Sequence, residues 1–302
     1  MLDDALHLLA CPHCAAPLSR RARSVACPDG HSFDVARHGY VSLLPGDARL
    51  GSADTAEMVA AREAFLAAGH FDPLAGAIAG EAERALGEEA VQALGADVER
   101  ARGAEAPSGD GPVAGAGGCV VDLGAGTGWY LARVLDRLPG RVGLALDLSK
   151  HALRRAARAH PRIGAVACDV WRGLPVRDSV AALALGVFAP RNGAEIARLL
   201  RPGAALVVVT PTERHLAELV DALGLLTVDE RKQERLAAEL DPHLELERRV
   251  EREWPLALGR DDAVNAVAMG PSARHVALEE ALEPPGAVTA SVAISTYRRR
   301  PG

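Results

Sequence analysis

The sequence of 302 residues predicts an α/β fold with a mostly parallel sheet, preceded by a small metal-binding module. Short apolar runs alternate with amphipathic segments from Cys119 onward, which is the pattern of strands and helices around a parallel sheet. Cysteine, histidine and turn-forming residues are instead concentrated in residues 1–45. Hydrophobic residues make up 49% and charged residues 25% of the chain, so it can bury a packed core.

A helical connection and a linker are expected between these two parts. Residues 46–102 carry apolar side chains at helical spacing, as at Met58 and Phe65, which predicts helices there. Residues 103–118 consist largely of Gly, Ala, Pro and Ser, which predicts a flexible linker. The main α/β domain is then expected to span residues 119–302.

Seven strands are expected in the main domain. Five alternate with helices, which predicts parallel pairing with helices on both faces, and the last two would close the sheet by antiparallel pairing. The expected strands are Cys119–Leu123, Val142–Leu146, Ala165–Cys168, Val180–Val187, Ala204–Thr210, Leu244–Val250 and Val288–Tyr297. The expected helices are Tyr130–Leu138, Lys150–His160, Ala194–Leu200 and Glu213–Leu223.

Charge, cysteine usage and hydropathy restrict the functional class. A net charge of -6 argues against a protein coated in nucleic acid, although arginines such as Arg154, Arg155 and Arg158 leave room for a local basic face. The N-terminus lacks the basic and apolar segments of a signal peptide, and no apolar run approaches the roughly 20 residues that span a bilayer. The five cysteines do not form a disulfide pattern. We therefore expect a cytoplasmic protein without a membrane partner.

Two close pairs of metal-ligating residues lie in residues 1–45. Cys11 and Cys14 form the first pair, and Cys27 and His31 form the second. Each pair sits on a turn, so four ligands can converge on one zinc ion in a zinc-ribbon-like domain. All four positions of a tetrahedral site would be filled by protein, which indicates a structural zinc. The alternative is ordinary thiols in a reducing cytosol, but the spacing favours zinc.

A glycine-rich turn follows the first expected strand of the main domain. Residues Asp122–Gly128 have the pattern D-x-G-x-G-x-G. A dinucleotide fingerprint would need glycine where Trp129 stands, and a phosphate-binding P-loop would need Gly-Lys-Ser/Thr. The glycines predict that the backbone approaches a ligand closely at the start of a helix.

Three carboxylates favour S-adenosylmethionine as that ligand. Asp122 would repel a pyrophosphate, but it suits a ligand that carries an ammonium and a sulfonium group. Asp147 ends the second expected strand and is placed to accept from ribose hydroxyls, and Asp169 ends the third and could accept from the adenine amine. These features predict a class I (Rossmann-like) methyltransferase. The alternative is that the glycines only make turns and the aspartates only cap helices.

Taken together, the segments resemble the zinc-containing 23S rRNA guanine-N1 methyltransferases, especially the actinobacterial members linked to resistance against tylosin-type macrolides. The likeness covers nearly the whole chain. It rests on the two ligand pairs and on the segments Phe33–Val41, Met58–Arg62, Gly69–Phe71, Val121–Gly128, Ala189–Asn192 and Thr210–Leu216.

This resemblance implies a substrate, partners and further site residues. The substrate would be a guanine in a hairpin loop of 23S rRNA near the peptide exit tunnel, and the protein would form a homodimer with zinc modules flanking an RNA cleft. The zinc ligands fall on Cys11, Cys14, Cys27 and His31. The resemblance implies two further cofactor contacts, Phe71 in the helical connection and His215 in the main domain. The expected cofactor-binding set is then Phe71, Asp122, Gly124, Gly126, Thr127, Gly128, Asp147, Asp169 and His215.

The turn after the fourth expected strand is expected to face the reacting centre, because it lies at the carboxyl edge of the parallel sheet. Guanine N1 must lose a proton before or during methyl transfer, and no residue identifies itself as the base. Arg191 and Asn192, in that turn, are our catalytic candidates, because they could hydrogen-bond the guanine edge or stabilise charge on O6. Two rival functions stay open: methylation of a quinone-like or antibiotic small molecule, and zinc-dependent RNA binding without catalysis.

Overall fold

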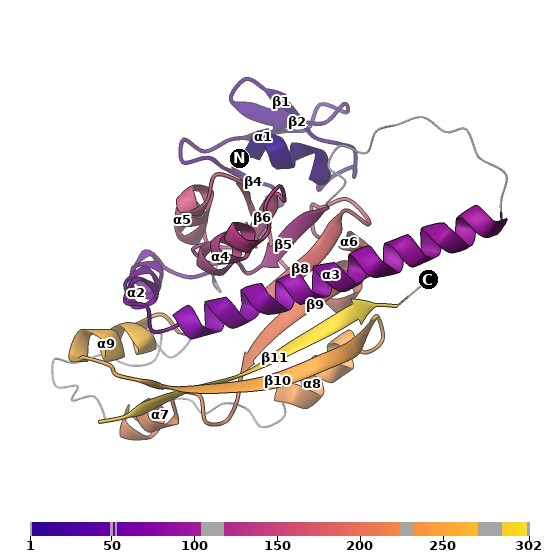
Figure 1. The fold of residues 1–302 in the computed structure, drawn as a ribbon. Helices are drawn as coiled ribbons and strands as arrows, with labels where there is room; N and C mark the ends of the chain where they lie inside the picture. The colour runs from indigo at the N-terminus through magenta and orange to yellow at the C-terminus, as the bar shows by residue number, and fades with distance from the viewer. Residues whose placement is uncertain are drawn as a thin grey trace.

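The computed structural model of the protein describes residues 2–48, 51, 53–103, 118–223, 232–270 and 286–300. It has a small N-terminal module, a large central sheet and helices on both faces of that sheet (Figure 1). All but the first and last residues of the expected linker at 103–118 lie outside the described part of the chain. Among the described residues, no helix has the length and apolar character needed to cross a membrane.

The N-terminal module is built from very short elements. It contains the helical turns α1 (Leu2–Ala5) and η1 (Leu6–Leu8) and the strands β1 (Ser19–Arg21), β2 (Ser24–Ala26) and β3 (Ser32–Asp34). These three strands form one antiparallel sheet in the order β1-β2-β3. Three-residue strands bury little surface, so the module depends on other contacts for its stability.

The central sheet has eight strands in the order β10-β11-β9-β8-β5-β6-β7-β4. Its strands are β4 (Tyr40–Ser42), β5 (Cys119–Leu123), β6 (Gly143–Asp147), β7 (Ile163–Ala167), β8 (Ala181–Val187), β9 (Leu200–Pro211), β10 (Leu244–Leu256) and β11 (Val288–Arg299). The pairing is parallel from β4 to β9, whereas β11 is antiparallel to both β9 and β10. The Rossmann-like methyltransferase fold predicted from the sequence is thereby confirmed.

The strand count differs from the expected seven, because β4 of the N-terminal region joins the sheet edge. Tyr40, Val41 and Ser42 pair in parallel with Ala165, Val166 and Ala167 of β7. A three-residue strand shows too little periodicity to be recognised in the sequence. Its pairing fastens the metal-binding module to the main sheet, and apolar side chains of the module share one core with the sheet.

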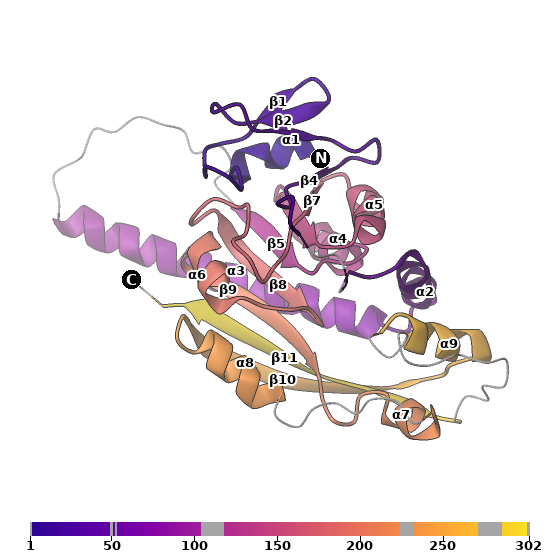
Figure 2. The same ribbon diagram turned by 180° about the vertical axis from the view of Figure 1, so that it is seen from behind.

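The helices divide between the two faces of the sheet. They are α2 (Ala56–Ala67), α3 (Asp72–Gly103), α4 (Trp129–Arg137), α5 (Lys150–Ala159), α6 (Gly193–Leu199), α7 (Ala217–Leu223), α8 (Lys232–Leu240) and α9 (Arg260–Ala268). One core is shared by α2, α3, α4, α5 and α9, and the other by the N-terminal module, α6 and α8. In the view from behind, α6 and α8 lie on the near face of the sheet and α3 on the far face (Figure 2).

Side-chain alternation along β5 sets up the functional edge. Val120 packs in the core on the α3 and α4 side, whereas Val121 and Leu123 pack in the opposite core. Because successive side chains in a strand point to opposite faces, Asp122 points to the same side as Val120. The carboxyl end of β5 therefore presents a carboxylate under the start of α4.

Candidate functional site

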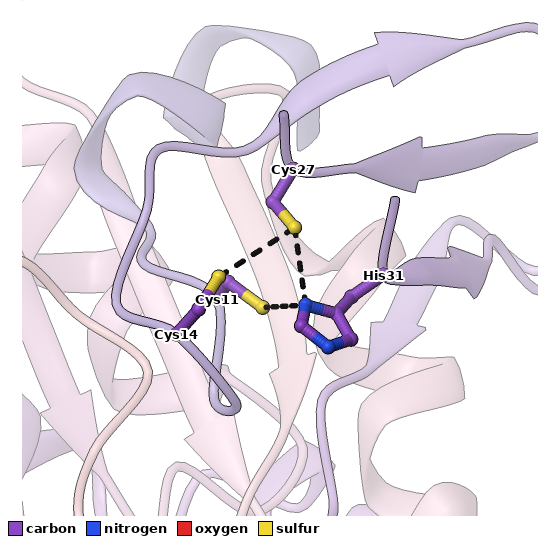
Figure 3. Close-up of side chains that lie close together, drawn as sticks. All are labelled: Cys11, Cys14, Cys27 and His31. Carbon is purple, nitrogen blue, oxygen red and sulfur yellow. Dashed lines mark hydrogen bonds between the residues drawn. The ribbon is translucent and has the colours of Figure 1, made fainter. Parts of the chain in front are cut away.

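The four predicted zinc ligands converge in the N-terminal module (Figure 3). The ligand atoms of Cys11, Cys14, Cys27 and His31 all lie within 4.8 Å of one another. The Cys14 and Cys27 sulfurs are 3.6 Å apart, and the Nδ1 atom of His31 lies 3.3 Å from the Cys27 sulfur and 3.7 Å from the Cys11 sulfur. Bonds of about 2.3 Å to sulfur and 2.0 Å to nitrogen in a tetrahedron require ligand separations of roughly 3.5–3.8 Å. The donor set thus fits a four-coordinate zinc with no position left for a reactive water.

Two tight turns hold these ligands. In the first, the Ala15 amide donates to the Cys11 carbonyl at 2.8 Å. In the second, the Cys27 amide donates to the His31 carbonyl at 3.0 Å, and Gly30 adopts a left-handed φ of 88°. A residue with a Cβ would strain that turn, so glycine is what lets Cys27 and His31 face the same point.

The glycine loop lies between β5 and α4. Gly124, Gly126 and Gly128 have φ values of 64°, 54° and 74°, which are left-handed and favour glycine. A Cβ on Gly124 would lie 2.7 Å from the Cβ of Ala189, and a Cβ on Gly128 would lie 2.9 Å from the Cα of Ala156. The loop is therefore packed against its neighbours so closely that only glycine fits.

The two predicted carboxylates nearest this loop lie close together, with Asp122 buried and Asp147 partly buried. One oxygen of Asp147 accepts from the Gly126 amide at 2.8 Å and the other from the Ser149 amide at 2.7 Å. Asp122 is 2% exposed, and burial raises its pKa well above the usual value, with a further contribution from the negative charge of Asp147. Burial raises the pKa of both carboxyl groups, so a cationic partner would favour their ionised forms. S-adenosylmethionine carries ammonium and sulfonium groups, so its positive charge complements these two carboxyl groups.

The remaining predicted contacts of the cofactor lie around the same edge. Thr127 is buried within the loop. Asp169 follows β7 and accepts from the Trp171 amide at 3.0 Å, so its carboxylate is held at the strand end where an adenine amine was expected. Cys119 in β5 and Cys168, the residue after β7, are both buried free thiols.

Arg62 of α2 is a candidate that the sequence reasoning missed. Its Nη1 atom would lie 3.4 Å from a Cβ on Gly126, so the guanidinium borders the glycine loop. The same group pairs with Asp54 and donates to the Met269 carbonyl at 2.7 Å. A cation at this place is suited to the carboxylate end of an amino acid. The available signal was one arginine at helical spacing between the buried Met58 and Leu66.

Aromatic rings gather on the other side of the carboxyl edge. The buried Phe71 ring centroid lies 6.0 Å from His215, 6.3 Å from Phe188 and 5.7 Å from Trp254. The Trp254 indole donates to the His70 carbonyl at 2.9 Å, which fixes its ring. The Ser291 amide donates to His215 Nδ1 at 3.2 Å, so a neutral His215 carries its proton on Nε2. The structure thus brings Phe71 and His215 together, and adds Trp254 and also Phe188, which begins the turn that was expected to face the reacting centre.

The two catalytic candidates each have a structural contact. Asn192 caps α6, because its Oδ1 accepts from the Glu195 amide at 3.3 Å. Arg191 is 11% exposed and its Nε lies 4.0 Å from a carboxylate oxygen of Glu239 in α8. That Nε has no hydrogen-bond partner among the described residues. Burial lowers the pKa of Arg191 despite the nearby Glu239.

A basic cavity of about 630 Å³ opens beside the glycine loop, between α2, α4 and α5. Its lining includes Trp129, Arg133, Arg155, Arg158 and Glu63. Arg133 lies 3.9 Å from the centre of the Trp129 ring, and Arg155 pairs with Glu63 at 2.8 Å. Arg133 also lies 3.6 Å from a carboxylate oxygen of Asp72, so two of the three arginines have acidic partners and the lining as a whole is still more basic than acidic.

Comparisons with known proteins agree with this site. The zinc-ribbon family described as RlmA, N-terminal, matches residues 9–49. The chain is 50% identical to the 23S rRNA (guanine(748)-N(1))-methyltransferase of Streptomyces fradiae over 91% of this chain and 89% of the relative. It is 49% identical to a relative from Micromonospora griseorubida, named for guanine-N1 methylation of 23S rRNA, over 99% of both chains. A relative from Bacillus subtilis, named in the same way, is 29% identical over 69% of this chain and 66% of the relative. The chain belongs to the family of 23S rRNA (guanine-N1)-methyltransferases.

Proposed function

We propose that this protein transfers the methyl group of S-adenosylmethionine to N1 of a guanine in a hairpin loop of 23S rRNA near the peptide exit tunnel. The observation that carries the proposal is the 50% identity with the Streptomyces fradiae methyltransferase over 91% of the chain. The name of that relative specifies guanine 748, and we propose the same position here. We also propose a role in resistance to tylosin-type macrolides, which rests on the resemblance to the actinobacterial resistance methyltransferases.

The cofactor would be held at the carboxyl ends of β5, β6 and β7. S-adenosylmethionine supplies an activated methyl group on a positively charged sulfur. Asp122 and the loop Gly124–Gly128 would surround its methionine part, Asp147 would accept from the ribose, and Asp169 from the adenine amine. Phe71 and His215 would close the pocket from the aromatic side. Arg62 would face the carboxylate of the methionine part.

Positioning of the acceptor would provide much of the catalysis, because methyl transfer is an in-line displacement. We propose that Asn192 and Arg191 contact the edge of the guanine. The Oδ1 of Asn192 is engaged by the α6 cap, so its Nδ2 would be the group that donates to guanine O6. That contact would stabilise the negative charge that O6 gains when N1 loses its proton.

Asn192→Asp isolates this donor. An aspartate caps a helix as well as asparagine does, but its carboxylate cannot donate. We expect turnover to fall at least about tenfold, as for the loss of one hydrogen bond to a developing charge, with the affinity for S-adenosylmethionine unchanged. Asn192→Ala should be less stable by about 1 kcal/mol, because it also loses the cap. Equal losses of turnover and cofactor affinity in the aspartate variant would contradict the assignment.

The remaining parts of the chain are assigned by the same proposal. Residues 1–45 would recognise RNA, residues 46–102 would contribute to the cofactor site, residues 103–118 would be a flexible linker, and residues 119–302 would carry the chemistry. We propose a cytoplasmic homodimer with two zinc modules flanking one RNA cleft. Light scattering of the purified protein, with and without an rRNA hairpin, measures the oligomeric state.

Labelled S-adenosylmethionine and unmethylated 23S rRNA test the function directly. We expect label in the RNA, and reverse transcription that stops one nucleotide 3′ to the modified guanine, because an N1 methyl group blocks pairing. Asp147→Ala, made in the cofactor cradle, is the matched inactive control. Methylation of a small molecule in the absence of RNA, or RNA binding without methyl transfer by the wild type, would refute the proposal.

A further inference from the structure

Phe188, the first residue after β8, is an apolar side chain in an unfavourable setting. Its side chain is 40% exposed, whereas the neighbouring Val187 and Ala189 are at most 9% exposed. Its φ of 53° lies in the left-handed region, which bulky residues rarely adopt. A phenylalanine that leaves 40% of its surface exposed and has a left-handed backbone is better explained by ligand contact than by folding alone.

The contacts of the Phe188 ring define which side is open. The centroid of the ring lies 5.6 Å from that of His215 and 6.3 Å from that of Phe71, with interplanar angles of 36° and 40°. Phe71 is 2% exposed, so these two neighbours form the inner wall. The exposed part of the Phe188 ring faces away from them, towards solvent.

The segment after Phe188 ties this ring to the cofactor loop. A Cβ on Gly124 would lie 2.7 Å from the Cβ of Ala189 and 3.4 Å from the Cδ of Pro190. The backbone of Phe188 is also fixed, because its amide donates to the Val209 carbonyl at 3.1 Å. The ring is therefore held at a set position one residue away from the contact with the glycine loop.

We propose that Phe188 is the stacking platform of the base-binding subsite and holds the flat face of the target purine. This inference rests on the proposed function and specifies how its substrate is held. Transfer to N1 requires that the methyl donor approach in the plane of the base, because the N1 electron pair lies in that plane. A ring that stacks on the purine face leaves this edge open towards the glycine loop. Aromatic stacking is also the usual way in which proteins hold an unpaired base of RNA.

Variants of Phe188 separate stacking from simple apolar contact. Phe188→Leu keeps an apolar side chain but removes the π face, and we expect kcat/KM for the RNA to fall by about tenfold or more. Phe188→Tyr keeps the ring and should remain within about threefold of the wild type. The dissociation constant for S-adenosylmethionine, measured by calorimetry, should stay within about twofold for both variants. Leu246→Ala removes another exposed apolar side chain, 47% exposed on the distant edge strand β10, and is the matched control.

A third variant tests whether Phe188 instead serves the fold. Asparagine tolerates a left-handed backbone, so Phe188→Asn should lose activity on RNA without any decrease in melting temperature. A lower melting temperature that accounts for the activity loss would overturn the proposal. So would a leucine variant with normal kcat/KM, or one in which cofactor affinity falls as much as kcat/KM. A wild-type protein that does not methylate 23S rRNA would refute the proposed function itself, and the stacking inference with it.

Discussion

Substitution of Gly124 by alanine tests whether the cofactor loop and the acceptor loop are packed as the structure shows. Gly124 has a left-handed φ of 64°, and an added Cβ would lie 2.7 Å from the Cβ of Ala189. Gly140, in the turn before β6, has a similar φ of 80° but no atom within 4 Å of an added Cβ. Gly140→Ala therefore introduces the backbone strain alone, and Gly124→Ala introduces the same strain together with a steric overlap.

The two contributions can be estimated separately. A left-handed backbone costs a residue with a Cβ about 1–2 kcal/mol. Overpacking in a close-packed region adds about 1–3 kcal/mol. We expect Gly140→Ala to destabilise the protein by about 1–2 kcal/mol and Gly124→Ala by about 2–5 kcal/mol. At about 2–4 °C per kcal/mol for a protein of this size class, the melting temperatures should fall by about 2–8 °C and 4–20 °C respectively.

Thermal melting and calorimetric titration with S-adenosylmethionine measure both consequences. The overlap can be relieved only if the glycine loop or the Ala189 turn moves, so Gly124→Ala should weaken cofactor binding by about tenfold or more. Gly140→Ala should bind the cofactor normally. Equal melting temperatures and equal cofactor affinities in the two variants would refute the close packing of the two loops.

Three further predictions concern the metal, a buried charge and the basic cavity. Chelation of zinc, or Cys14→Ser, should lower the melting temperature and abolish binding of 23S rRNA, because the module folds around the ion; unchanged RNA binding after verified metal loss would contradict this. The folded-state pKa of Asp122 is raised above its unfolded value, so this carboxyl group favours folding at low pH, and its contribution is lost as pH rises through the folded pKa. Asp122→Asn should remove this decline in the stability of the apo-protein and should weaken cofactor binding. Thermal melting and calorimetric titration across pH measure the two effects. If Arg155 and Arg158 contact phosphates, Arg155→Gln and Arg158→Gln should each reduce the slope of log K for RNA binding against log salt concentration by about 0.7–0.9, with cofactor affinity unchanged. An unaltered slope would show that the cavity does not touch RNA.

The parts of the fold that follow from local pattern were predictable. The strand β5 has the predicted bounds Cys119–Leu123, because five buried residues are followed directly by a glycine turn. The observed ends of helices α4 and α5 lie within one residue of their expected ends. The zinc ligands were equally accessible to sequence reasoning, since their chemistry depends on residue type and on short spacing.

Features created by long-range contacts were less accessible. The expected strand Leu244–Val250 continues to Leu256, because pairing with β11 overrides the charged residues of its exposed face. The expected helix Glu213–Leu223 begins only at Ala217, because the preceding residues turn towards β11, where Thr212 meets Ser291. Tertiary pairing decides such boundaries, and a single sequence does not contain it in readable form.

The acceptor side of the site illustrates the same limit at the level of single residues. The turn after β8 was correctly placed at the carboxyl edge, but the sequence did not indicate which of its side chains face the substrate. Arg191 points to Glu239, 48 residues further along the chain, whereas Phe188 faces His215 and Phe71, which come from two other segments. The inner wall of the base-binding subsite is therefore assembled from residues that are distant in sequence. The aromatic character of this wall can be recognised only when the sheet has brought these residues together. The ring of Phe188 is therefore a stronger structural argument for a planar acceptor than the charge of Arg191.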